Sequence, residues 1–210
     1  DLAERHGGRV SYKTNPDGTE TPYELNLTYF DAINNPNDPS LEKDEQVKRF
    51  VCTQGIPMAL IGIPGIYIHS LLGSRNDYLG REETGQSRSI NREKLAIEGL
   101  EEELADPDSL RAQVMQGVLT LLEIRQAQPA FHPNAHQAVL SVERNVFAVL
   151  RASKALDGQR ILALYNVSSK QQSVSVRAII SGTSHDLISG EPCTAELIEL
   201  APYQICWLSF

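Results

Sequence analysis

The feature that most constrains the fold of this chain is a change in its hydrophobic pattern near Phe131. Before this point apolar residues recur at helical spacing between polar loops, and after it short apolar runs alternate with turn residues. Runs separated by turns every ~8–12 residues are typical of an antiparallel β-sandwich. The sequence therefore predicts an α/β plus all-β fold, with one domain over residues 1–133 and an antiparallel β domain over 134–210. The expected strands are Ala138–Val142, Val146–Arg151, Arg160–Val167, Ser173–Ile180, His185–Ile188, Thr194–Leu200 and Gln204–Phe210, with a hairpin turn at Asp157-Gly158.

Two long helices are predicted in the first part of the chain. Ser40 is a good N-cap for a helix over Leu41–Leu60, and Asp106-Pro107-Asp108-Ser109 begins a helix that continues through Leu110–Arg125. Near the start of the chain, Asn15-Pro16-Asp17-Gly18 predicts a turn. Short strands at Val10–Lys13 and Tyr23–Leu27 would flank this turn.

One apolar segment between these helices predicts a buried strand. Ile61–His69 is short and β-branched, as in a parallel strand covered on both faces, and the polar segment Ser70–Lys94 after it reads as a long loop. A single strand cannot build a parallel sheet. We therefore expect this region either to complete its sheet with residues upstream of Asp1 or to fold as an irregular cap.

Composition and charge exclude several classes of function. The 210 residues carry 19 Lys and Arg against 27 Asp and Glu, a net charge of −8, whereas nucleic-acid binders present a basic face to phosphates. No apolar run of about 18 residues exists, so we expect no membrane-spanning helix. The three cysteines fit neither a disulfide framework nor a zinc site and favour a reducing, cytoplasmic location. No two histidines have metal-ligand spacing on a helix face, so we expect no metal site.

Several motifs together resemble the α-amylase superfamily (glycoside hydrolase family 13), in its sucrose phosphorylase-like branch. Gly62-Ile63-Pro64-Gly65-Ile66-Tyr67 is similar to the last barrel strand of that family and the turn before it. The segment Pro22–Phe30 contains Tyr-x-x-Asn-x-Thr-Tyr, and Ser89-Ile90-Asn91-Arg92 is similar to an Asp-Ile-Asn-Arg motif of sucrose phosphorylases. Leu200–Gln204 leading into Cys206-Trp207-Leu208 resembles the closing strand of the C-terminal β domain of the superfamily.

Within this branch, the residues of two segments are more similar to those of glucosylglycerate phosphorylases than to those of enzymes that act on sucrose. These segments are Gly73-Ser74-Arg75 and Asn91-Arg92-Glu93-Lys94-Leu95. Two residues depart from the sucrose phosphorylase pattern, because Glu24 stands where Gln is common and Ser89 stands where Asp is common. The acceptor, whether fructose, its 6-phosphate, glycerol or glycerate, stays open on these residues.

The resemblance implies a fold and an activity for the parent protein. The fold is the C-terminal part of a (β/α)8 TIM barrel followed by an antiparallel β-sandwich domain. The activity is retaining glucosyl transfer from a sucrose- or glucosylglycerate-like substrate to inorganic phosphate, giving α-glucose 1-phosphate without a cofactor. The catalytic acids of the family lie upstream of the matched region, so we expect the chain to lack the upstream barrel half and to be inactive alone.

The resemblance also implies which residues bind substrate, and it places no catalytic residue in this chain. In sucrose phosphorylases the Arg that matches Arg92 contacts the glucosyl unit, and a guanidinium suits paired hydroxyls or a carboxylate. Its neighbour Asn91 belongs to the same motif, and Tyr23, Glu24 and Asn26 match an acceptor-side loop.

Two more candidates come from the predicted strand and the loop after it. Of the arginines in the loop, Arg75 is our preferred ligand for phosphate or a carboxylate, and His69 at the end of the predicted strand could reach the site. For Arg92, Glu24 and Arg75 the alternative is a solvated surface charge, and for His69 it is an ordinary core histidine.

Two other functions remain open on the sequence alone. One is another hydrolase or transglucosidase of the same superfamily, with the same fold. The other is a free-standing β-sandwich module that binds sugar or protein and does no chemistry.

Overall fold

The computed structural model describes residues 2–155, 158–194 and 196–210, and the chain divides into two compact units. The first unit comprises residues 1–50 and 66–116, and the second comprises 51–65 and 117–210. The two predicted long helices are present as α3 (Lys43–Ala59) and α7 (Leu110–Gln126), and each contributes part of its length to both units. The boundary expected between residues 133 and 134 stays a prediction.

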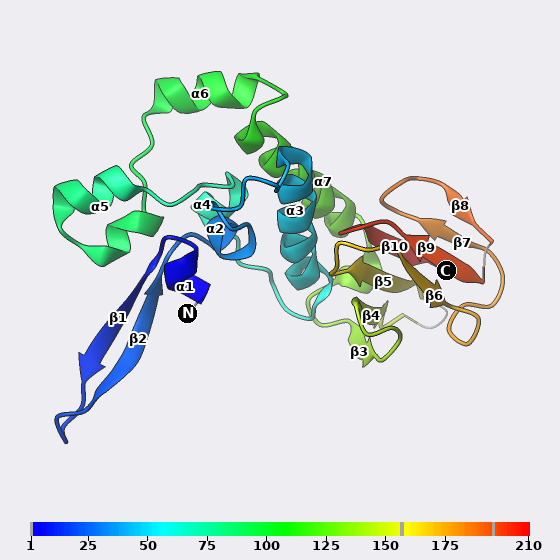
Figure 1. The fold of residues 1–210 in the computed structure, drawn as a ribbon. Helices are drawn as coiled ribbons and strands as arrows, with labels where there is room; N and C mark the ends of the chain where they lie inside the picture. Colours follow the sequence, from blue (N-terminus) through cyan, green and yellow to red (C-terminus); the bar gives the residue numbers. More distant parts are fainter. Residues whose placement is uncertain (1, 156–157, 195) are drawn as a thin grey trace. The chain divides into compact units, whose positions relative to one another are not determined.

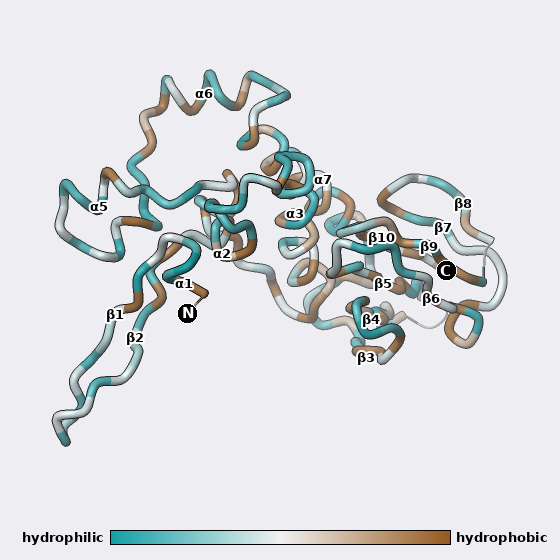
Figure 2. The backbone as a smooth tube through the Cα atoms, in the orientation of Figure 1, coloured by the Kyte–Doolittle hydropathy of each residue, from teal (hydrophilic) through white to brown (hydrophobic). Residues whose placement is uncertain are grey.

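The first unit begins with the expected hairpin. Strands β1 (Arg9–Thr14) and β2 (Glu20–Asn26) pair antiparallel, and Gly18 turns the chain with φ +82°, a conformation that favours glycine (Figure 1). The hairpin is mostly hydrophilic along its length (Figure 2). The remaining elements of this unit, besides its parts of α3 and α7, are α1 (Leu2–Arg5), α2 (Tyr29–Ile33), α4 (Ile68–Leu71), α5 (Tyr78–Thr84), the 3₁₀ helix η1 (Ser87–Asn91) and α6 (Ile97–Ala105).

The buried strand predicted over Ile61–His69 is wrong. The segment is irregular up to Tyr67 and then forms the single turn of α4, where the amides of Ser70 and Leu71 bond to the carbonyl of Tyr67, both at 2.9 Å. Every strand pair among the described residues is antiparallel, so a parallel strand here would find no neighbour for its backbone groups. Ile63 is accordingly 85% exposed.

The loop predicted over Ser70–Lys94 is more ordered than expected. It contains α5 and η1, and the signals for α5 were present in the sequence. The side chain of Asp77 caps the helix by accepting a hydrogen bond from the amide of Gly80 at 2.8 Å, and Gly85 ends it in the left-handed region. Charged residues of both signs lie between these caps, so the segment has no apolar face from which a helix could be predicted.

The second unit contains the predicted antiparallel β domain. Six strands form one sheet in the order β3-β4-β5-β10-β7-β8, and β6 pairs with β9 in a second sheet (Figure 1). Asp157 of the predicted turn lies outside the described residues, but the strands on either side of it, β4 and β5, pair antiparallel as expected. The bounds are β3 (His136–Leu140), β4 (Val146–Ala152), β5 (Arg160–Asn166), β6 (Gln172–Ser175), β7 (Ser184–Asp186), β8 (Pro192–Cys193), β9 (Leu197–Leu200) and β10 (Ile205–Ser209), preceded by the 3₁₀ helix η2 (Pro129–Phe131).

The central strands of the larger sheet are buried on both faces. Alternate residues of β4, β5 and β10 pack with β6 and β9 in one apolar cluster. On the other face lie residues 51–59 of α3, where Gly55 allows close approach, because a Cβ there would lie 2.8 Å from Ile205 Cδ1. The carbonyl of Gly55 accepts from the hydroxyl of Tyr165 at 2.8 Å, and that hydroxyl accepts from Trp207 Nε1 at 2.9 Å. The sheet is thus a sandwich layer with a helical cover.

A buried arginine joins the end of α3 to the sheet. Arg151 on β4 is fully buried and donates to the carbonyls of Ala59 (2.7 Å), His132 (2.8 Å) and His136 (3.2 Å). Burial lowers the pKa of this guanidinium, because the charged form loses its hydration. Arg151 therefore satisfies carbonyl groups that come from three different segments.

Among the described residues, none of the helices combines the length and the apolar character that crossing a bilayer would require.

Replacing Arg151 with Lys should lower the free energy of unfolding by about 2 kcal/mol or more, since one ammonium group cannot reach all three carbonyls and a buried unpaired acceptor costs ~1–3 kcal/mol. Urea unfolding followed by the fluorescence of Trp207, in the same unit, measures this. The control is Arg144→Lys at an exposed position, where we expect a change within about 0.5 kcal/mol. Equal effects of the two substitutions would contradict the role of Arg151.

Candidate functional site

All seven residues predicted to bind substrate lie in the first unit. Tyr23, Glu24 and Asn26 are on β2, and Asn91 and Arg92 are at the end of η1. An ion pair joins the two segments, with Arg88 Nη2 of η1 at 3.4 Å from Glu24 Oε2. The two motifs that carry the resemblance, about 65 residues apart in the chain, therefore meet in space.

The residues on β2 differ in their exposure. Tyr23 is 65% exposed and free to meet a ligand, whereas Asn26 is buried and its Nδ2 donates to Ser11 Oγ at 2.7 Å across the hairpin. The Oδ1 atom of Asn26 is buried and has no hydrogen-bond donor among the described residues. The side chain of Asn26 thus links β1 to β2 through Nδ2, while its Oδ1 atom accepts no hydrogen bond from the described residues.

Arg92 has a positive charge that no described residue compensates. Its side chain is exposed, and no hydrogen bond or ion pair of its guanidinium occurs within residues 2–155, 158–194 and 196–210. A free guanidinium fork is suited to a carboxylate or to paired hydroxyls. The geometry leaves Arg92 available for the binding role that its motif predicts.

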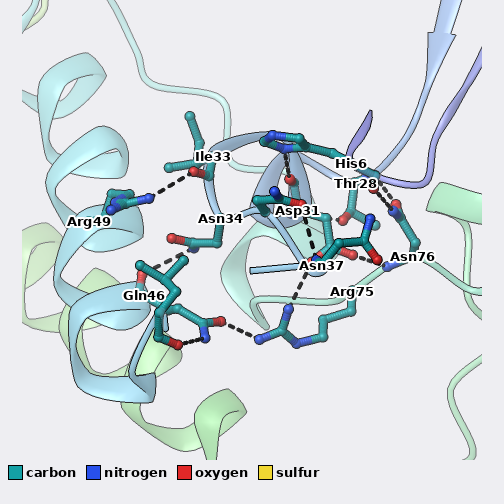
Figure 3. Close-up of polar contacts among 12 residues, drawn as sticks. His6, Thr28, Asp31, Ile33, Asn34, Asn37, Gln46, Arg49, Arg75 and Asn76 are labelled. Carbon is teal, nitrogen blue, oxygen red and sulfur yellow. Dashed lines mark hydrogen bonds and ion pairs between the residues drawn. The ribbon is translucent and has the colours of Figure 1, made fainter. Parts of the chain in front are cut away.

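The positive charge of Arg75, in contrast, is already compensated. Its Nη1 lies 3.0 Å from Asp31 Oδ1, and its Nη2 donates to Gln46 Oε1 (Figure 3). The guanidinium also lies 5.0 Å from the ring centroid of Phe30. The side chain is 41% exposed, while Asp31 is 1% exposed. Binding of an anion by Arg75 stays a prediction. The ion pair with Asp31 weakens the electrostatic attraction between Arg75 and such an anion.

Asp31, on α2, is the residue that the sequence analysis missed. Its Oδ2 accepts from the amide of Asn76 at 2.7 Å, and its carbonyl lies 2.7 Å from Nδ1 of His6. Burial raises the pKa of Asp31, although the amide of Asn76 and the charge of Arg75 act in the opposite direction. A single acid inside the apolar run Leu27–Ile33 was the available signal, because buried carboxylates are rare unless paired.

Asn76 completes a network around Asp31. Its Oδ1 accepts from the amide of Thr28 at 2.8 Å, and its Nδ2 donates to the carbonyl of His6 at 3.1 Å (Figure 3). The Asp31 network, defined as His6, Thr28, Asp31, Arg75 and Asn76, therefore connects α1, α2 and the turn after α4.

His69 lies in α4 and not at the end of a strand. It is buried, its Nδ1 is 3.1 Å from Ser74 Oγ, and its ring meets that of Tyr67 edge-on at 5.2 Å. Burial is the main cause that lowers the pKa of His69, so its imidazole is neutral near pH 7. A neutral imidazole offers one donor and one acceptor.

His69 and Asn91 meet at one pocket of about 290 Å³. The start of α2 forms one wall, and α4 with the residue before it forms the other. Because Asp31 lies on α2 and Asn76 lies just after α4, the Asp31 network connects the two walls. The lining residues are Leu27, Thr28, Tyr29, Ala32, Tyr67, His69, Ser70 and Asn91.

Metal binding has no support in the described part of the chain, where no group of three or more His, Cys, Asp and Glu side chains is placed to hold an ion.

Replacing Asp31 with Ala should lower the free energy of unfolding by about 3 kcal/mol, because it leaves the buried amide of Asn76 without an acceptor and breaks the pair with Arg75. The matched control is Glu24→Ala, which breaks the solvent-exposed pair with Arg88 and should cost no more than about 1 kcal/mol. Urea unfolding followed by circular dichroism measures both, since Trp207 is in the other unit. Losses of equal size would contradict the central place of Asp31.

Comparison with known proteins identifies relatives over nearly the whole chain. No family model matches it. Proteins named glucosylglycerate phosphorylase from Spirochaeta thermophila, Allomeiothermus silvanus and Escherichia coli are 40%, 42% and 35% identical over 97%, 97% and 98% of the chain. The chain spans about a third of the length of these curated relatives (36%, 34% and 35%).

Solved structures agree on the fold. Sucrose 6F-phosphate phosphorylase from Thermoanaerobacter thermosaccharolyticum superposes with a TM-score of 0.63 at 19% identity, over 93% of this chain and 35% of that chain. AmyP in complex with maltose gives a TM-score of 0.63 at 19% identity, over 83% of this chain and 35% of that chain. The fold is the C-terminal part of a (β/α)8 barrel followed by an antiparallel β-sandwich. The chain therefore belongs to the α-amylase superfamily (glycoside hydrolase family 13), in its sucrose phosphorylase-like branch.

Proposed function

We propose that these residues are part of a retaining α-glucoside phosphorylase. The enzyme transfers the glucosyl group of a glucosylglycerate-like substrate to inorganic phosphate and produces α-glucose 1-phosphate. The observation that carries this proposal is the sequence identity of 35–42% to three proteins named glucosylglycerate phosphorylase, over at least 97% of the chain. Glycerate is the acceptor in this proposal, and the cytoplasm is the compartment.

The catalytic carboxylates come from a part of the protein outside these 210 residues. Retaining transfer needs two carboxyl groups on either side of the scissile bond, one of them free to attack the sugar. In the first unit Asp31 is bound to Arg75 and Asn76, and Glu93 and Glu103 are both paired with Arg111. These three carboxylates are occupied by partners, and the family resemblance places the catalytic acids upstream of the matched region. The chain alone is then inactive.

The first unit supplies the substrate-binding rim in this proposal. Active sites of (β/α)8 barrels form from the loops that follow the strands, and the family resemblance implies that η1 and Arg92 belong to such a loop, although the described residues form no strand directly before it. The uncompensated charge of Arg92 supports its contact with the glucosyl unit or a carboxylate. Glu24 pairs with Arg88, which supports a role in orienting an arginine and avoids a bare negative charge beside an anionic acceptor.

The test is the phosphate dependence of the intact protein that carries this chain. Given glucosylglycerate and phosphate, it should produce α-glucose 1-phosphate and glycerate, and without phosphate, turnover should fall by at least tenfold. Sucrose, its 6′-phosphate and glucosylglycerol serve as comparison substrates, and glucosylglycerate should give the highest kcat/KM. Release of glucose at the same rate with and without phosphate would contradict the proposal.

The isolated chain is the control for the source of the catalytic acids. It should form no detectable α-glucose 1-phosphate under the same conditions. Turnover by the isolated chain would show that its own carboxylates are sufficient.

A further inference from the structure

A chain of hydrogen bonds leads from the first turn of α7 to His69. Arg111 Nη1 donates to Ser74 Oγ at 2.8 Å, and Ser74 Oγ lies 3.1 Å from His69 Nδ1. The backbone keeps Ser74 beside the histidine, because its amide donates to the carbonyl of His69 at 2.8 Å. Of these three residues only His69 lines the pocket of about 290 Å³. The chain therefore connects a pocket residue with two residues outside the lining.

Arg111 fixes the direction of each hydrogen bond in this chain. A guanidinium can only donate, so Ser74 Oγ accepts from it. Ser74 is 1% exposed, and His69 Nδ1 is the one acceptor that the described residues offer to its hydroxyl hydrogen. With the proton of His69 on Nδ1 instead, this buried hydroxyl hydrogen would have no acceptor, which is costly. A neutral imidazole whose Nδ1 accepts carries its proton on Nε2.

We infer that Arg111 and Ser74 are positioning residues that hold the proton of His69 on Nε2, so that the imidazole donates a hydrogen bond to an oxygen atom of the bound substrate. The inference rests on the proposed function, which supplies an oxygen-rich substrate at this site. Nδ1 is occupied by Ser74, and Nε2 bonds to none of the residues 2–155, 158–194 and 196–210. Nε2 is therefore the ring nitrogen that is left for a ligand.

Arg111 occupies a position at which the helix alone disfavours a cation. It is the second residue of α7, and the helix macrodipole places partial positive charge at this end. Two carboxylates offset this charge, since Nη2 lies 2.8 Å from Glu93 Oε2 and Nε is paired with Glu103. The side chain is only 14% exposed. These contacts hold the guanidinium in one orientation, with Nη1 directed at Ser74.

The turn that carries Ser74 is packed against the same helix. Gly73 has φ +58°, in the left-handed region that favours glycine. A Cβ at this position would lie 3.0 Å from Val114 Cγ2, and Val114 is one turn after Arg111 on α7. This close approach brings the hydroxyl of Ser74 within reach of Arg111.

The surroundings of His69 favour a neutral imidazole. Burial is the main cause that lowers the pKa of His69, Glu93 raises this pKa, and the positive charge of Arg111 lowers it. Glu93 and Arg111 are the charged groups of the described residues that act on the ring, and the ring of Tyr67 meets it edge-on at 5.2 Å. Removal of Arg111 should therefore raise the pKa of His69, because one positive charge is lost and Glu93 loses its partner.

The first experiment is nitrogen NMR of the intact protein with isotope-labelled histidine, in which His69→Gln identifies the resonances of His69 by their loss. In the wild type we expect the ring proton on Nε2, with Nδ1 as an unprotonated acceptor. In Arg111→Gln the pKa of His69, measured by titration of the same resonances, should rise by about one pH unit. A ring proton on Nδ1 in the wild type, or an unchanged pKa in Arg111→Gln, would overturn the inference.

The second experiment measures kcat and KM for the glucoside in the presence of phosphate. Ser74→Ala removes the donor to Nδ1 without a change of charge and should raise KM about tenfold with kcat changed less than twofold, because the affected hydrogen bond binds substrate and transition state alike. Arg111→Gln should raise KM in the same direction. The matched control is Glu103→Gln, which weakens a contact of Arg111 that does not involve Ser74 and should change KM less than twofold.

The outcomes separate this inference from the proposed function. If phosphate-dependent turnover is present but KM is unchanged in Ser74→Ala and Arg111→Gln, the positioning role is overturned and the function stands. An equal rise of KM in Glu103→Gln would also overturn it, because packing of α6 on α7 would then explain the effect. If turnover does not depend on phosphate but the NMR results are as expected, the proposed function fails and the control of the His69 proton by Arg111 and Ser74 stands.

Discussion

The first unit depends on one buried carboxylate. Asp31 is almost inaccessible to solvent, and its two oxygens receive Arg75 and the amide of Asn76. Burying a charge is costly unless it is paired and hydrogen-bonded, so Asp31 can remain buried only while both partners stay in place. This requirement fixes the turn after α4 against α2, and the pocket of about 290 Å³ lies between the start of α2 and α4 itself.

The two units have different sources of order. The second unit contains a two-sided apolar sheet, with β5 and β10 buried on both faces and Trp207 bonded to Tyr165 inside. The first unit has short helices and a hydrophilic hairpin, and much of its order comes from side-chain hydrogen bonds between segments far apart in sequence. The hydrogen-bonded order of the first unit is consistent with a site that accepts and releases a polar ligand, because the polar groups of such a site are already arranged before the ligand binds.

Sequence patterns predicted the elements that local chemistry determines. Apolar spacing predicted α3 and α7 to within two residues at either end, and turn residues predicted the hairpin and the sheet strands. Ser109 caps α7 by accepting from the amide of Ala112 at 3.0 Å, whereas α3 begins at Lys43 and the expected N-cap, Ser40, instead donates to Asp38 Oδ1 at 2.6 Å. The strand expected over Ile61–His69 failed because an apolar, β-branched run does not reveal whether a neighbouring strand exists. Asp31 was missed because its partner Arg75 is 44 residues away, and no local pattern links the two. Arg92 was found through its motif, while the pocket beside it depends on side chains from three segments.

Amide hydrogen exchange at Asn76 and Thr28 tests the central claim most directly. Both amides lie outside regular helical bonding and donate to side-chain oxygens, Asn76 to Asp31 at 2.7 Å and Thr28 to Asn76 at 2.8 Å. If the Asp31 network holds the unit together, these two amides should exchange as slowly as those in the middle of α3. Exchange at the rate of an unstructured loop would contradict the account.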